Sequence, residues 1–146
     1  MKDQELELLL GICRVIAKRF IDMAEFHTYP KQRVAAEYEI RLAKVGLCCV
    51  PFGPTSKRIR IAKNLDKAGL VTLSQFRKGG TWDVKFTSLD LSQKIYDMAL
   101  KSVEGFEFHE GKHWVSYPQF SKTSKGFSEV ERLGQMAFEV LKESAA

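Results

Sequence analysis

Eight of the chain's lysines and arginines fall within one short stretch, residues 55–87, where their types and spacing could bind anions. They are Lys57, Arg58, Arg60, Lys63, Lys67, Arg77, Lys78 and Lys85. Only Asp66 and Asp83 oppose them, so the stretch carries a net charge of +6. The whole chain of 146 residues carries +5, so everything outside the stretch sums to −1. Such local concentration is typical of contact with phosphate groups, although a merely solvated helix face is the alternative.

Residues 109–113, His-Glu-Gly-Lys-His, satisfy the pattern H-E-x-x-H. In that pattern two histidines one helical turn apart bind zinc, and the glutamate activates a water molecule. The geometry requires a helix, but Gly111 lies inside the motif and the aromatic residues around it favour strands. His27 is the only other histidine, so no third ligand stands at an evident spacing. We therefore expect a hairpin with flanking histidines rather than a zinc peptidase, and a hairpin metal site is the alternative.

The three cysteines also indicate no metal site and no disulfide framework. Cys48 and Cys49 are adjacent, a placement that seldom forms a bridge, and Cys13 provides no C-x₂-C partner for zinc. We therefore interpret the cysteines as buried thiols and expect a reducing cytoplasm as the compartment. No Ser/His/Asp set or glycine-rich phosphate loop stands out, so we expect neither an enzyme nor a bound cofactor. No signal peptide is evident, and no run approaches the roughly 18 apolar residues of a membrane span.

The basic residues need a helix and a hairpin to position them. Thr55 or Ser56 is a suitable N-cap for a helix from about Lys57 to Ala68, and Pro54 prevents its extension backwards. At about 100° per residue, one side of this helix is apolar and packs, while the other side is a basic polar ridge. The packing side holds Ile61, Ala62, Leu65 and Ala68, with Arg58 near its edge, and the ridge holds Arg60, Lys63, Asn64 and Lys67.

A two-stranded hairpin follows this helix. Gly69 suits the position just after a helix end, and residues 70–76 alternate well enough for a strand. Arg77-Lys78-Gly79-Gly80 then turns the chain, and residues 81–87 return with Trp82, Val84 and Phe86 on one face.

The chain before residue 55 reads as support for this unit. A helix over residues 3–27 carries apolar residues spaced alternately three and four apart, beside a second apolar stripe. The first stripe is Leu6, Leu9, Cys13, Ile16, Phe20 and Met23, and the second is Leu10, Ala17, Ile21 and Ala24. Core packing and a dimer helix are both open interpretations. A second helix is expected over residues 31–45, followed by an extended apolar connection over residues 46–54.

The chain after residue 87 predicts three more elements. Thr87 and Asp90 form a capping box for a helix running to about Glu104, with Gly105 at its exit. Residues 106–120 alternate and are aromatic, which predicts a second hairpin. A polar loop over residues 121–126 precedes a last helix, residues 129–143, for which Ser128 and Glu131 form another capping box.

A basic helix, its G-L-V exit and a hairpin with a cationic tip resemble the second half of a winged helix-turn-helix domain. The resemblance covers about residues 30–103, and "NLDKAGLV" and "VKFTSLD" are similar to segments of small bacterial regulators of the multiple-antibiotic-resistance type. The length of 146 residues predicts a single domain over residues 1–146, and the fold class expected with the resemblance is mainly α with β-hairpins (α+β). The winged core would carry a long N-terminal helix, an extra C-terminal hairpin and a C-terminal helix, so that residues 3–27 and 106–143 give support or dimerisation.

The resemblance implies a cytoplasmic transcriptional regulator that binds double-stranded DNA. Lys57, Arg60, Lys63, Asn64 and Lys67 would face the major groove, where arginine suits guanine and asparagine suits adenine. Arg77, Lys78 and Lys85 would meet phosphates or the minor groove. A homodimer through the first and last helices is expected, since one winged domain reads only a half-site. The alternative is a protein-interaction module, such as an inhibitor or adaptor, that sets its basic face against an acidic protein.

Overall fold

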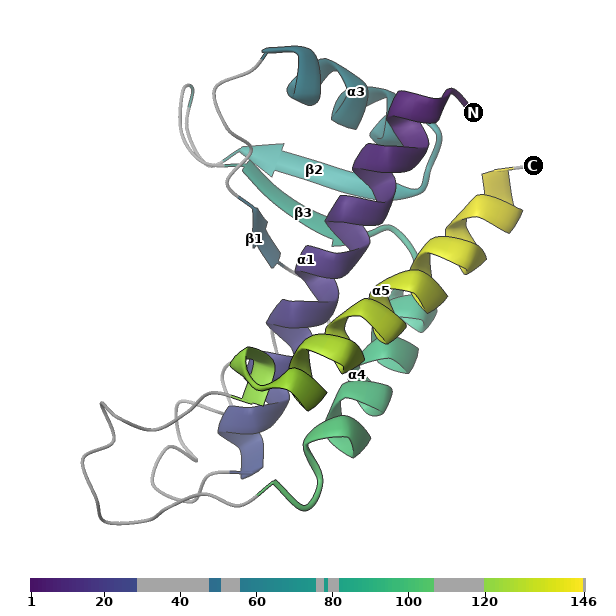
Figure 1. Cartoon of the computed structure of the whole chain (residues 1–146). Coiled ribbons are helices and arrows are strands. Elements are labelled where there is room, and N and C mark those ends of the chain that lie inside the picture. Colours follow the sequence, from purple (N-terminus) through teal and green to yellow (C-terminus); the bar gives the residue numbers. More distant parts are fainter. Residues whose placement is uncertain (29–47, 51–55, 76–77, 79–81, 107–119, 146) are drawn as a thin grey trace.

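The computed structural model describes residues 1–28, 48–50, 56–75, 78, 82–106 and 120–145 (Figure 1). The described part of the chain is mostly helical with one small antiparallel sheet, which confirms the expected α+β class at this level. The helix expected over residues 31–45 lies outside the described residues. So do all but the first and last residues of the hairpin expected over 106–120.

Helix α1 (Asp3–Thr28) is the element that the other described elements pack around (Figure 1). Its bounds agree closely with the expected helix. Nine of its apolar residues are between 0 and 2% exposed, and they come from both expected stripes, with Ile12 between them. They are Leu9, Ile12, Cys13, Ile16, Ala17, Phe20, Ile21, Met23 and Ala24. The two stripes are therefore core within one chain, and only their first members, Leu6 and Leu10, are partly exposed.

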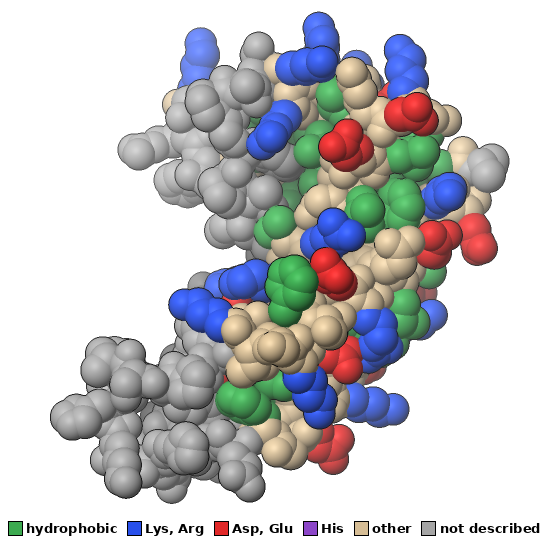
Figure 2. Space-filling view, viewed as in Figure 1, with side chains coloured by type: hydrophobic (Ala, Val, Ile, Leu, Met, Phe, Trp, Pro, Cys, Tyr) green, Lys and Arg blue, Asp and Glu red, His purple; other side chains and the backbone are tan. Residues whose placement is uncertain are grey.

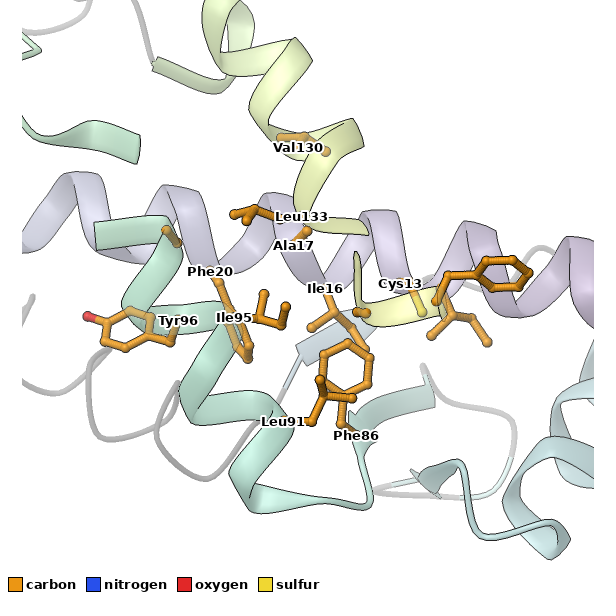
Figure 3. Close-up of a cluster of buried hydrophobic side chains, with 14 of the residues drawn as sticks. Cys13, Ile16, Ala17, Phe20, Phe86, Leu91, Ile95, Tyr96, Val130 and Leu133 are labelled. Carbon is orange, nitrogen blue, oxygen red and sulfur yellow. The ribbon is translucent and has the colours of Figure 1, made fainter. Parts of the chain in front are cut away.

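Helix α4 (Leu89–Val103) and helix α5 (Ser124–Ala145) pack against α1. Figure 3 shows Phe20 of α1 beside Ile95 and Tyr96 of α4, and the rings of Phe20 and Tyr96 meet edge to face at 6.0 Å. Helix α5 approaches α1 closely at Gly134, where an added Cβ would lie 2.8 Å from Arg14 Cγ. The absence of a side chain there lets the two helix backbones come near each other.

The sheet has the strand order β1-β3-β2, with both pairs antiparallel. Strands β2 (Val71–Gln75) and β3 (Trp82–Phe86) form the expected hairpin, in a register that sets Leu73 opposite Val84. Strand β1 (Cys48–Val50) lies within the expected extended connection and pairs with the other side of β3. Val84 and Phe86 are buried against the helices, so this sheet face belongs to the common core (Figure 3).

Helix α3 (Ser56–Lys67) begins one residue before the expected start. It ends as expected at Gly69, whose φ of 78° is one that side chains disfavour. The Gly69 N–H donates to the Asp66 carbonyl at 2.9 Å and the Leu70 N–H donates to the Leu65 carbonyl at 3.2 Å, the pair of bonds of a Schellman C-cap. Ala68, which we expected on the packing side, is exposed because it lies in this terminating turn.

The expected cap of α4 is wrong by one residue. Ser88 is the N-cap, and its hydroxyl oxygen accepts the Leu91 N–H at 3.1 Å. The Thr87 hydroxyl instead contacts the Thr72 hydroxyl at 3.0 Å, across the end of the hairpin. Thr87 therefore contacts Thr72 of β2 and does not cap α4.

The expected start of the last helix is also wrong. Helix α5 begins at Ser124, so residues 124–126 are helical rather than loop, and a 3-10 turn η3 (Phe120–Lys122) precedes them. The Thr123 hydroxyl oxygen accepts the Gly126 N–H at 3.0 Å, which is a capping bond. Ser128 therefore lies within the helix and caps nothing.

The start of α5 is tied to the C-terminal half of α1 by two carboxylates. Glu25 Oε1 accepts the Phe120 N–H at 2.9 Å, and Asp22 Oδ1 accepts the Ser121 hydroxyl at 2.7 Å. Burial raises the pKa of Glu25, while its bond to the Phe120 N–H acts in the opposite direction. A buried acceptor at this point satisfies a backbone N–H that no helix or strand partner would reach.

Gly126→Ala should destabilise the fold, whereas Gly11→Ala should not. A Cβ at position 126 would overlap the Phe120 carbonyl oxygen and lie 2.9 Å from Ser121 Cα, so the backbone of η3 would have to move. We expect a loss of about 1 to 3 kcal/mol of unfolding free energy. Gly11 is helical with open space around it, and alanine there should add about 0.5 to 1 kcal/mol. Urea denaturation of both variants measures this, and equal effects would contradict the close approach.

Candidate nucleic-acid interface

Helix α3 presents a continuous basic ridge to solvent. Ala62 and Leu65 are 0% exposed and hold the helix on the core. On the opposite side the structure brings together the five predicted helix residues, and all five are exposed: Lys57, Arg60, Lys63, Asn64 and Lys67. Figure 2 shows Lys and Arg side chains gathered along the edge of the molecule formed by α3. Arg58, expected nearer the packing side, is exposed as well.

Neither the acidic residue of this helix nor the described residues around it balance its positive charge. Five Lys and Arg against one Asp give α3 a net charge of +4, and no acidic residue stands in its first turn. Lys57 and Arg58 occupy that turn, where the helix dipole disfavours positive charge. Ion pairs in the described part of the chain include those of Lys18 with Asp22 and of Arg132 with Glu129, and no described carboxylate pairs with the α3 cations. A bound anion would relieve this repulsion.

Asp66, the one acidic residue of α3, is directed at the hairpin instead of at the ridge. Its Oδ2 accepts the Leu73 N–H at 2.9 Å. Among the described strands β2 lies at an edge of the sheet, so one row of its backbone groups has no described strand as a partner. The carboxylate satisfies one of these N–H groups and fixes the hairpin against the helix. The exposed ridge is thereby left without a negative charge.

Lys63 makes a second contact between α3 and the hairpin. Its Nζ lies 5.6 Å from the centroid of the Trp82 ring, within the range of a cation–π interaction. Trp82 is half-buried and, by strand alternation, lies on the same sheet face as Val84 and Phe86. Lys63 therefore stands on the flank of the ridge that borders the hairpin.

The predicted hairpin residues do not all join the ridge. Lys85 alternates with the buried Val84 and Phe86, so it lies on the outer sheet face, opposite Thr72 of β2. Lys78 is exposed near the hairpin turn. Arg77 lies outside the described residues. The structure thus separates Lys85 from the α3 cations, because a strand directs neighbouring side chains to opposite faces.

Sequence reasoning did not identify Asp66 and Trp82 as residues of this site. A signal for each was present: Asp66 is the single acidic residue in a basic helix, and Trp82 is a large aromatic residue at the start of a returning strand. Neither signal names a partner. Both contacts join residues of α3 to residues of the hairpin, and only folding brings these together.

The residues considered for metal chemistry give no site in the described structure. His109, Glu110 and His113 lie outside the described residues, and Cys48 and Cys49 lie in β1. Cys13 is fully buried in the core, and burial raises its pKa to about 12, so it is held as a thiol. Among the residues that the structure describes, no group of three His, Cys, Asp or Glu could hold a metal ion.

No described helix combines the length and the apolarity needed to cross a membrane. Comparisons of the chain with protein-family models, curated proteins and solved structures found no match.

Asp66→Ala should loosen the hairpin from α3, whereas Asp66→Asn should largely preserve the contact. Alanine leaves the Leu73 N–H without its acceptor, at a cost of about 1 to 2 kcal/mol for a partly exposed bond. Asparagine keeps a side-chain oxygen and should lose less. Chemical denaturation measures both, and hydrogen exchange at the Leu73 amide should accelerate selectively in the alanine variant. Equal losses in the two variants would show that the carboxamide oxygen cannot replace the carboxylate.

Proposed function

We propose that this chain is a double-stranded-DNA-binding protein of the winged helix-turn-helix type that acts in the cytoplasm as a small transcriptional regulator. The observation that carries the proposal is the exposed basic ridge of α3, which pairs with no described carboxylate and lies beside a hairpin that Asp66 holds to the same helix. A cationic helix and a hairpin in fixed relation are the two parts that such proteins set against a duplex.

The order of elements supports the winged-helix class. Helix α3 leads through the Gly69 cap directly into the β2–β3 hairpin, and β1 completes a three-stranded sheet. Helix α4 follows at once and packs mainly against α1 and α5, with a smaller contact to β3 and with Leu91 and Ile95 in the core. The described helices and strands share one hydrophobic core, which supports a single domain over residues 1–146. The winged core within it would span about residues 30–103.

The ridge has side chains suited to both kinds of DNA contact. Arg60 and Asn64 are four residues apart and therefore share a helix face, so both can meet base edges in one major groove. Lys57 and Lys67 carry point charges suited to phosphate, and Lys78 near the hairpin turn would add another. Lys85 would contribute from the outer sheet face.

The homodimer stays part of the proposal because one winged domain reaches only a half-site. The stripes of α1 on which we based it are buried within the chain, and so are Leu133, Ala137 and Leu141 of α5. A dimer therefore needs surfaces of these helices other than their core faces.

Binding of duplex DNA should weaken steeply with salt. If about five phosphates are neutralised, log K against log salt should have a slope near −4 to −5, because each contact releases condensed counterions. Fluorescence anisotropy of a labelled random duplex measures the slope. Lys57→Gln should make it shallower, whereas Lys94→Gln, an exposed lysine of α4, should not. Absence of binding at low salt would refute the DNA proposal and favour an acidic protein as the partner.

Variants of base-contacting residues and variants of phosphate-contacting residues should show different losses of DNA affinity. After selection of a preferred duplex, Arg60→Ala or Asn64→Ala should cost about 1 to 3 kcal/mol on that duplex and relax base preference. Lys78→Ala should weaken preferred and random duplexes alike, because phosphate contacts carry no sequence information. Competition binding against random DNA gives both affinities. Equal losses on both duplexes for all three variants would mean that α3 does not read bases.

A further inference from the structure

Lys63 differs from the other lysines of the ridge because a ring from another element holds it. Its ammonium lies 5.6 Å from the centroid of the Trp82 ring, a residue 19 positions away in sequence. Another cation–π contact in the described part of the chain joins Lys142 to Phe138, one turn apart on the same helix. The Lys63 contact therefore has a tertiary origin, and it occurs at the border between α3 and the hairpin.

The bond between Asp66 and the hairpin fixes where Lys63 lies relative to Trp82. Asp66 follows three residues later, so the two side chains share one flank of the helix. The bond from the Leu73 N–H to Asp66 sets the hairpin against that flank. Because Trp82 pairs with Gln75 in the hairpin register, the same bond also places the Trp82 ring.

The Lys63 ammonium keeps hydrogen-bonding capacity in this position. It has three N–H donors, and a ring face covers only one side of it. The side chain is exposed, and no described carboxylate pairs with it. A cation that lies against a ring, pairs with no described carboxylate and stays exposed should lose less rotamer freedom on binding an anion than a lysine without such a contact.

We propose that Lys63 and Trp82 form a phosphate-binding subsite at the junction of α3 and the β2–β3 hairpin, in which Trp82 positions the ammonium for one backbone phosphate of a duplex. This subsite rests on the DNA-binding function proposed above. It moves Lys63 from the residues that read bases to those that fix the protein on the backbone. When a helix lies in the major groove and a hairpin lies along the backbone, a phosphate passes between them.

The geometry favours a phosphate over a base edge as the partner of Lys63. Base edges would meet the crest of the ridge, where Arg60 and Asn64 lie, and a point charge on the flank carries no directional pattern for reading them. Lys67 offers a matched comparison, because it is an exposed lysine of the same helix without a ring contact in the described residues.

Duplex-binding measurements over a range of salt concentrations test the subsite with Lys63→Gln, Trp82→Leu and their double variant. Lys63→Gln should make the slope of log K against log salt shallower by about one. Trp82→Leu retains the cation, so the slope should stay unchanged while affinity falls about two- to fivefold. The double variant should bind no more weakly than Lys63→Gln alone, because Trp82 acts through Lys63.

Lys67→Gln combined with Trp82→Leu is the control pair, and here the two losses should multiply. Thermal denaturation verifies that each variant is folded. If Trp82→Leu does not fold, Trp82→Phe replaces it and should show a smaller loss in the same direction, because phenylalanine keeps a weaker ring. Multiplying losses for Lys63 and Trp82 would overturn the subsite and leave DNA binding intact. A wild-type chain that binds no duplex would overturn both.

Discussion

Burial of the apolar stripes of α1 is the constraint on which the rest of the structure depends. Residues from Leu9 to Ala24 line one helix over several turns, and α3, α4, α5 and the sheet each cover part of it. A helix that is apolar over so wide an arc cannot face water on either stripe, so it draws the other elements around itself. Figure 3 shows the result: Ile16 lies beside Phe86 and Leu91, Phe20 lies beside Ile95, and Ala17 lies beside Leu133.

Helix α3 contributes only a small part of its surface to this core. Helix α3 contributes Ala62 and Leu65 to the core, and most of its remaining surface is polar and exposed. Its stability therefore depends on a narrow contact, on the Gly69 cap and on the bond between Asp66 and Leu73. The same bond places the hairpin. One carboxylate thus links the stability of the helix to the geometry of the candidate interface, and it does so without lowering the charge of the ridge.

The electrostatics of the ridge favour an anionic partner for a physical reason that concerns the folded chain alone. Lys57 and Arg58 repel the positive end of their own helix dipole, and no described carboxylate offsets them. Such an arrangement costs stability in isolation. A bound polyanion would recover that stability, and a duplex presents phosphates at regular spacing along its length.

The sequence by itself determined the helical bounds of α1, the α3–hairpin unit, the Gly69 stop and the exposure of the five predicted ridge residues. These features follow from periodicity and from glycine, which act over a few neighbouring residues. Tertiary structure decided the rest. It placed the Thr87 hydroxyl against that of Thr72, so that Ser88 is the N-cap of α4. It also buried the apolar stripes of α1 inside a single chain. It also joined Asp66 to Leu73 and Lys63 to Trp82. Those outcomes depend on which elements meet in space, and local sequence patterns carry no record of partners that lie in other elements.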